Sequence, residues 1–238
     1  QWRERFFGPL NCHDKAWHLM FYQPELDDHG LPYNPFKSII VPRPIGWITT
    51  IDREGRVNLA PYSQFQNIGY DPPYILFSSS SDRHKHTALN CMDTGEFVTN
   101  MATYDLREAI NITAQPVEAG VDEAQLAGLE LEPSRLVKPP RVAASPVHLE
   151  CKYYCSLSLP GRHPNTMDTV IVGRVVGVHI KDEFITPDGR IDILKARPLA
   201  RMGYMDYTSV TDLFPIEPVG VGQQRRRRGL QGLPRNRW

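Results

Sequence analysis

A thirteen-residue stretch of alternating side chains constrains the fold of this chain more than any other feature. Its apolar positions alternate with mostly polar ones and are Val147, Leu149, Cys151, Tyr153, Cys155, Leu157 and Leu159. Successive side chains of a β-strand point to opposite faces, so the pattern predicts a long strand with one buried face. A sheet must form around this strand, and we expect Cys151 and Cys155 on the same face of it.

Shorter segments predict further strands joined by tight turns. The clearest hairpin pairs Ile45–Ile51 with Arg56–Ala60, across a turn whose Gly55 suits a left-handed position. The other expected strands are Ile75–Phe77, Glu96–Ala102 and Val170–Ile180, the last rich in Val and Ile like a strand buried on both faces. The expected helices are Asp82–Met92, Asp105–Ala114 after a capping box, and Val121–Leu129, while Pro133–Pro146 is expected to be a surface loop.

Strands outnumber helices in this pattern, and no βαβ repeat appears. We therefore expect a mainly β fold, an antiparallel barrel with short helices packed outside. At 238 residues the chain suits one sizeable domain. It has no apolar run near the roughly 18 residues that span a bilayer and no signal-peptide region, so we expect a soluble, cytoplasmic protein.

The charges are divided unevenly along the chain. All 27 acidic residues precede Gly220, and six arginines follow it, namely Arg225–Arg228, Arg235 and Arg237. Without those six, 21 basic residues face 27 acidic ones, so the body suits nonspecific nucleic-acid binding poorly. Residues 219–238 have no acidic residue and no periodicity, which predicts a disordered basic tail. Nucleic-acid binding through this tail is the weakest of the functional alternatives.

The four cysteines, Cys12, Cys91, Cys151 and Cys155, form no CxxC pair. We favour buried thiols in a reducing compartment over disulfides. No metal is expected, because no second Cys/His pair stands at the spacing of zinc ligands. His84 and His86 lie in a basic segment that suits an anion, or simple exposure to solvent, better than a metal.

A serine run before a basic helix start suggests an anion site. The strand Ile75–Phe77 leads into Ser78–Ser81, and Arg83, Lys85 and Thr87 fall in the first turns of the expected helix. A helix N-terminus has unpaired N–H groups and a partial positive charge, so it favours anions. Hydroxyls and cations there suit a phosphate, although a serine before a helix also acts as an ordinary N-cap.

Motifs of other enzyme classes are missing. The sequence has no P-loop and no dinucleotide fingerprint, since Gly220-Val221-Gly222 follows no strand and opens no helix. Ser63 stands in no GxSxG elbow, so serine hydrolase chemistry is unsupported. Redox chemistry stays compatible with the chain, because a cofactor held by a barrel can supply it.

Five segments follow one another in a distinctive order. They are Pro42–Thr50, Asn58–Phe65, Asp71-Pro72-Pro73, Thr94–Asn100 and Leu199–Tyr204. In this order and spacing the chain resembles the flavin reductase-like, FMN-binding split-barrel family, and in particular its flavoredoxin-like branch. The resemblance covers Met20 to Pro218, so we expect an extension at 1–19, a split-barrel domain at 20–218 and the tail at 219–238.

The resemblance implies bound FMN. The phosphate would be held by Ser78, Ser79, Ser80, Ser81, Lys85 and Thr87, with His86 where the family usually has an acidic residue. The ring would be contacted by Tyr62, Ser63, Gln64 and Phe65, with Trp47 and Thr49 on the neighbouring strand. Ordinary roles compete: Trp47 and Phe65 suit the core, Tyr62 a barrel plug, and Asn100 either a strand cap or a ribityl contact.

The resemblance also implies that NADH or NADPH reduces FMN in a homodimer, and that a partner oxygenase or another acceptor takes the electrons. The alternative is a flavoredoxin-type electron carrier without steady-state reductase activity. His179, Arg201 and Tyr204 are the candidates for the nicotinamide side, although His179 is equally an exposed strand-end residue. No catalytic residue is assigned, because hydride transfer depends on alignment more than on a titrating side chain.

Overall fold

The computed structural model describes residues 19–81, 85–118 and 120–216. The chain divides into two compact units, Gln1–Ile40 and Val41–Trp238. In the first unit, the described residues include the 3-10 helix Pro35–Ser38, whose N-cap Asn34 accepts a hydrogen bond from the backbone of Phe36. The predictions for residues 1–18 and for the basic tail lie outside the described residues.

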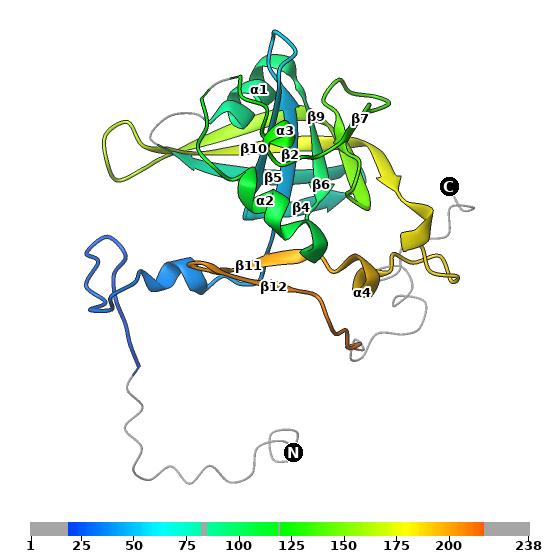
Figure 1. Ribbon diagram of the computed structural model, residues 1–238. Helices are drawn as coiled ribbons and strands as arrows, with labels where there is room; N and C mark the ends of the chain where they lie inside the picture. Colours follow the sequence, from blue (N-terminus) through cyan, green and yellow to red (C-terminus); the bar gives the residue numbers. More distant parts are fainter. Residues whose placement is uncertain (1–18, 82–84, 119, 217–238) are drawn as a thin grey trace. The chain divides into compact units, whose positions relative to one another are not determined.

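Seven described strands of the second unit form the main sheet, and all neighbours are antiparallel (Figure 1). They are β2 (Gly46–Ile51), β3 (Val57–Tyr62), β4 (Gln64–Tyr70), β5 (Pro73–Ser81), β6 (Glu96–Met101), β9 (Val147–Pro160) and β10 (Met167–Ile180). The order across the sheet is β3-β2-β6-β9-β10-β5-β4. The expected hairpin and the long alternating strand are confirmed as β2–β3 and β9.

The sheet closes on itself because its two edge strands are consecutive in the chain. Strands β3 and β4 stand at opposite ends of the strand order, yet Ser63 alone separates them. The sheet must curl for both edges to be reached, and β2 contacts β4 while β3 contacts β5. At this closure a Cβ on Gly46 would lie 2.7 Å from Cδ2 of Phe65, so glycine is required there. The mainly β split barrel is therefore confirmed.

Aromatic side chains fill the interior of the barrel. The buried ring of Phe77 lies 5.0 Å from the Tyr62 ring and 5.6 Å from the Phe97 ring, centroid to centroid. Both spacings suit favourable aromatic contacts. Burying one such ring stabilises the fold by roughly 1.5–3 kcal/mol.

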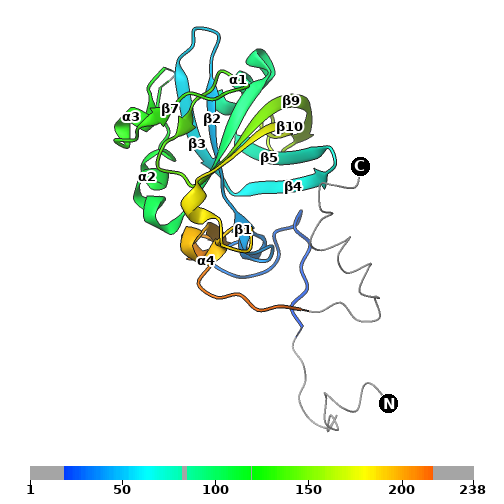
Figure 2. The ribbon, with the colours of Figure 1, turned by 90° about the vertical axis from the view of Figure 1, so that its right-hand side faces the viewer.

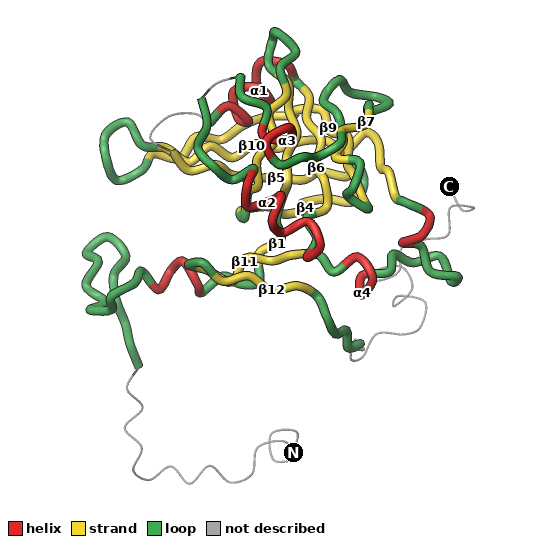
Figure 3. The backbone as a smooth tube through the Cα atoms, in the orientation of Figure 1, coloured by secondary structure: helices red, strands yellow, loops and turns green. Residues whose placement is uncertain are grey.

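The helices pack outside the strands (Figures 2 and 3). They are α1 (His86–Thr94), α2 (Arg107–Ile112), α3 (Glu123–Leu126) and α4 (Ile193–Ala196), with 3-10 turns at Tyr104–Leu106 and Asp182–Phe184. Helix α1 contacts β2, β3 and β6, and α3 contacts β3. Helix α1 ends at Gly95, whose φ of 74° is the left-handed conformation that favours glycine. No helix among the described residues is long and apolar enough to cross a membrane.

Two small sheets complete the described structure. One is formed by β1 (Arg43–Pro44), β11 (Leu199–Gly203) and β12 (Asp206–Ser209), in the order β1-β11-β12. The other pairs β7 (Leu131–Glu132) with β8 (Arg141–Val142). The prediction that Pro133–Pro146 is only a surface loop is wrong, because this segment includes β8 and buries Val137.

The serine run belongs to a strand, not to a helix start. Ser78–Ser81 continue β5 and pair with Met167–Val170 of β10, and Ser78 also pairs with Gln64 of β4. Their backbone groups join the sheet, so α1 begins at His86, four residues later than expected. The expected capping box is also wrong: α2 begins after Leu106 without a side-chain cap, and Asp105 lies in a 3-10 turn.

Two expectations about buried strand faces are wrong: that Cys151 and Cys155 share a face of β9, and that β10 is buried on both faces. Cys151 is buried but Cys155 is exposed. Tyr154 is an extra residue between the pairs Tyr153–Gly173 and Cys155–Val172, which changes the alternation of β9. Strand β10 buries one face only, since Val178 is 57% exposed.

A buried carboxylate holds the segment that follows β7. Glu150 of β9 is fully buried and accepts hydrogen bonds from the backbone N–H groups of Arg135 at 2.8 Å, Leu136 at 2.5 Å and Val137 at 3.1 Å. His179 Nε2 lies 2.5 Å from Oε1 of Glu150, the oxygen that also accepts from Arg135. Burial alone would raise the pKa of Glu150, but these hydrogen bonds hold it below the ordinary 4.5.

We predict that Glu150→Gln lowers the free energy of unfolding by about 3 kcal/mol at pH 7, because an amide cannot replace a carboxylate acceptor of four hydrogen bonds. A depressed folded-state pKa stabilises the fold above the unfolded-state pKa. The difference between wild type and variant should therefore be full at pH 7 and shrink below pH 4.5. Urea unfolding between pH 7 and pH 3.5 checks this, and a difference that is independent of pH contradicts it.

Candidate functional site

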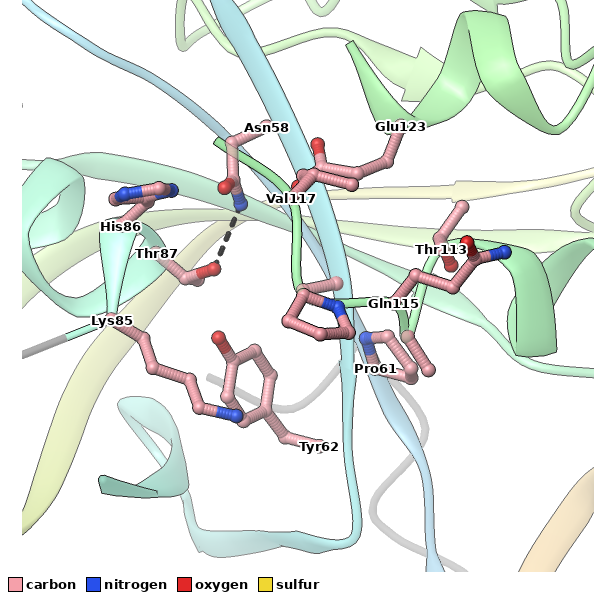
Figure 4. A pocket seen from close by; sticks show the side chains of 13 residues that line it. Asn58, Pro61, Tyr62, Lys85, His86, Thr87, Thr113, Gln115, Val117 and Glu123 are labelled. Atoms are coloured by element: carbon pink, nitrogen blue, oxygen red, sulfur yellow. Dashed lines mark hydrogen bonds between the residues drawn. The ribbon is translucent and has the colours of Figure 1, made fainter. Parts of the chain in front are cut away.

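A cavity of about 650 Å³ lies between β3, the start of α1, α3 and the segment after α2; we call it the β3–α1 cavity (Figure 4). It is lined by Asn58, Ala60, Pro61, Tyr62, Lys85, His86, Thr87, Thr113, Ala114, Gln115, Pro116, Val117 and Glu123. Its volume falls within the roughly 300–1,000 Å³ typical of small-molecule sites. Polar and apolar side chains share its walls, which suits a ligand with both kinds of surface.

The N-terminus of α1 faces this cavity. Lys85 is the N-cap residue, with extended backbone at φ −70° and ψ 151°, and within the described residues no side chain makes a capping hydrogen bond. The first N–H groups of the helix therefore stay available to a ligand, with the positive end of the helix dipole behind them. The exposed side chain of Lys85 extends into the cavity and forms no ion pair with a described residue (Figure 4). This arrangement favours an anion.

Thr87 and Tyr62 line the same end of the cavity. Thr87 is buried, and its hydroxyl accepts a hydrogen bond from Asn58 Nδ2 at 2.8 Å. The Tyr62 side chain points toward Thr87 (Figure 4). Burial raises the pKa of the Tyr62 phenol. The nearby Thr87 hydroxyl has the opposite but smaller effect, without reaching hydrogen-bond geometry. Tyr62 thus keeps its proton as a donor.

The Tyr62 hydroxyl has no partner in hydrogen-bond geometry among the described residues, although the residue is only 5% exposed. A buried hydroxyl without a hydrogen bond costs free energy. Because this one borders a cavity, a ligand acceptor could satisfy it.

A buried carboxylate stands in the wall of the cavity. Glu123 is buried, and its Oε2 accepts a hydrogen bond from the backbone N–H of Leu59 at 2.9 Å. Burial raises the pKa of Glu123 above its ordinary value. This contact attaches α3 to the edge of β3, so Glu123 fixes the wall that the cavity shares with the barrel.

The structure brings together three of the residues predicted from the sequence: Tyr62, Lys85 and Thr87. Five other predicted residues do not line the cavity. Ser63 connects β3 to β4, Gln64 and Phe65 lie in β4, and Ser78 and Ser79 lie in β5. Ser80 and Ser81 lie in β5, and their side chains are outside what the structure describes.

Trp47, Thr49 and Asn100 form a buried hydrogen-bond network behind the cavity. Asn100 Nδ2 donates to the Thr49 hydroxyl at 2.8 Å and to the Trp47 carbonyl at 3.0 Å, and Asn100 Oδ1 accepts from the Val142 backbone. Trp47 Nε1 donates to the Thr113 hydroxyl at 2.9 Å. Thr113 lines the cavity, so this network positions its wall rather than its ligand.

The candidates for the nicotinamide side do not line the β3–α1 cavity. His179 interacts with Glu150, and Arg201 hydrogen-bonds the hydroxyl of Tyr207. Tyr204 lies in the turn between β11 and β12 at a φ of 47°. Their role in binding a hydride donor stays a prediction.

Several lining residues were missed from the sequence. Asn58 and Pro61 belong to a segment that was singled out, but neither was assigned a role. Gln115, Pro116 and Glu123 carry no local signal. Glu123 reaches the cavity through the packing of α3 on β3, and the other two lie in the segment between α2 and α3. Within the described residues, no cluster of three His, Cys, Asp or Glu side chains could hold a metal ion.

Comparison with known proteins gives independent evidence of the family of this chain. Residues 38–194 match the model of the flavin reductase like domain. An uncharacterized protein of Aquifex aeolicus is 34% identical over 188 residues, which cover 78% of this chain and 92% of that protein.

Solved structures agree with this match. The chain is similar to component B of nitrilotriacetate monooxygenase from Bacillus cereus, at 27% identity and a TM-score of 0.77, over 83% of this chain and 98% of that one. A flavoredoxin of Desulfovibrio vulgaris (Miyazaki F) shares the fold at 20% identity and a TM-score of 0.64, over 77% of this chain and 94% of that one.

We predict that Tyr62→Phe leaves the stability of the ligand-free protein unchanged or raises it by up to about 1 kcal/mol, because the removed hydroxyl has no partner in hydrogen-bond geometry among the described residues. Thr87→Val is the matched comparison, since it removes a hydroxyl that Asn58 does use, and it should cost about 1 kcal/mol. Urea unfolding of both variants checks this. A loss of more than 1 kcal/mol in Tyr62→Phe would mean that the hydroxyl bonds the protein.

Proposed function

Because this chain belongs to the flavin reductase-like family, we propose that it binds FMN in the β3–α1 cavity and acts as an NAD(P)H-dependent flavin reductase. The observation that supports this most is the convergence of Lys85, Thr87 and the uncapped N-terminus of α1 at one end of the cavity. A phosphate dianion is the ligand group that such an end favours.

The residues present fit FMN in size and in chemistry. Lys85 would pair with the phosphate, and the first N–H groups of α1 would donate to it. The hydroxyl of Tyr62 would donate a hydrogen bond to a phosphate or ribityl oxygen. The Ala60–Tyr62 end of edge strand β3 would lie along the ring. Bound FMN would supply the two-electron chemistry, and the protein would supply position and exclusion of water.

The electron donor and acceptor are also proposals. NADH or NADPH would reduce the flavin, and a partner oxygenase or another acceptor would take the electrons. The similarity to one component of a monooxygenase supports an oxygenase as the partner. We further propose that the protein is a cytoplasmic homodimer. The alternative keeps the cofactor but makes the protein a flavoredoxin-type electron carrier.

We predict that Lys85→Ala weakens FMN binding by about 1.5–3 kcal/mol, the usual value of a charge-assisted hydrogen bond. The fold should survive, because the Lys85 side chain is exposed. Thr87 is buried, so Thr87→Val, which removes the hydroxyl without leaving a cavity, is a better partner variant than Thr87→Ala. Flavin fluorescence titration measures the effect, with Arg53→Gln, an exposed arginine of the β2–β3 turn, as the control. Unchanged affinity in Lys85→Ala would place the phosphate elsewhere.

We predict that the purified protein oxidises NADH or NADPH steadily when FMN is added, at a rate that saturates with flavin. The measurement is the loss of dihydronicotinamide absorbance under air. Tight flavin binding with no turnover by either nucleotide would instead support the electron carrier.

A further inference from the structure

A second cavity of about 490 Å³ lies between α2 and the β11–β12 hairpin, and we call it the α2 cavity. Figure 1 shows these elements facing one another within the second unit. Its side chains include two aromatic rings, a guanidinium group and an apolar set: Tyr104, Tyr207, Arg107, Ile110, Leu199 and Met205. The proposed flavin site uses none of these six residues.

The two cavities share a wall. Ala114, in the turn after α2, lines both of them. The preceding Thr113 faces the β3–α1 cavity and is fixed by its hydrogen bond from Trp47. A ligand in the α2 cavity would therefore lie next to whatever fills the β3–α1 cavity.

Guanidinium groups stack on the two tyrosine rings of the α2 cavity. Arg107 Cζ and Arg197 Cζ lie 4.2 Å and 4.1 Å from the centroid of the Tyr104 ring. Arg201 Cζ lies 4.5 Å from the centroid of the Tyr207 ring. Such stacking holds a guanidinium in place while its N–H edge can still donate.

Arg107 and Arg197 form only weak ion pairs with their acidic neighbours. Glu108 Oε1 is 3.5 Å from Arg107 Nε, and Asp105 Oδ1 is 3.9 Å from an Arg197 nitrogen. The Glu108 and Asp105 side chains are 80% and 76% exposed, so water competes for both pairs. One terminal nitrogen of Arg107 donates to the Tyr104 carbonyl at 2.9 Å, so the other terminal nitrogen is the one that would donate to a phosphate.

We propose that the α2 cavity binds the hydride donor, with Arg107 on a phosphate of the dinucleotide and the adenine ring packed against Tyr207 and Met205, since both faces of the Tyr104 ring already carry a guanidinium. The proposal rests on the proposed function, since it names the binding site of that reaction's co-substrate. It also replaces His179 as the residue on which donor binding depends, because His179 already interacts with the buried Glu150.

The test measures binding directly and does not depend on turnover. Oxidised NAD⁺ and NADP⁺ are titrated separately into the FMN-loaded protein by calorimetry. Arg107→Gln should weaken the preferred dinucleotide at least tenfold, while its affinity for FMN stays within twofold. Arg53→Gln, in the β2–β3 turn, is the matched control and should change neither affinity.

A pair of variants at Met205 tests the same site in case Arg107→Gln does not fold. Met205 is 88% exposed, so its replacement should leave the fold intact. Met205→Glu places a negative charge in the cavity and should weaken the dinucleotide about tenfold, whereas Met205→Lys should leave binding equal or tighter.

Two outcomes overturn this site: neither dinucleotide binds the wild type, or both Arg107→Gln and the Met205 pair leave binding unchanged. Binding that depends on Arg107, without reduction of the flavin by NADH or NADPH, would instead contradict the proposed function and leave the site in place.

Discussion

The closure of the main sheet is the constraint on which the rest of the structure depends. Ser63 alone connects β3 and β4, the two edges of the strand order, so the sheet has to curl into a barrel. The curl leaves the outer edge of β3 without a strand partner in the main sheet, and α1, α3 and the segment after α2 cover it. The β3–α1 cavity is the space left under that cover. It therefore follows from the topology of the barrel, and its chemistry comes from the residues that reach it.

Buried polar contacts give this cavity its fixed walls. Glu123 attaches α3 to β3, and Trp47 fixes Thr113 through its indole N–H. Buried polar groups destabilise a fold unless they are paired, so such paired networks position a wall with little freedom. Tyr62 differs from them, since its hydroxyl is buried beside the cavity without a partner among the described residues. The cavity thus has fixed walls and one hydroxyl, that of Tyr62, which can donate a hydrogen bond to a ligand. This arrangement suits a binding site better than a packing defect.

The sequence was sufficient for features that have a local cause. The long strand β9 and the glycine turn of the β2–β3 hairpin both follow from neighbouring residues. Predictions from the sequence were wrong where contacts between distant segments determine the structure. Ser78–Ser81 became part of β5 because β10 pairs with them, and Cys155 is exposed because Tyr154 interrupts the alternation. Glu123 and Gln115 reach the cavity through packing that no local pattern encodes. The resemblance supplied the family, whereas the geometry showed which of its expected contacts lie together.

The proposed flavin site depends most on the binding of the FMN phosphate at the N-terminus of α1. Riboflavin has the same ring and ribityl chain without the phosphate, so the difference in affinity between the two isolates that group. Charge-assisted hydrogen bonds from Lys85 and the helix N–H groups should add about 2–4 kcal/mol. FMN should therefore bind the wild-type protein at least about thirtyfold more tightly than riboflavin. Equal dissociation constants for FMN and riboflavin, measured by fluorescence titration in the same buffer, would contradict it.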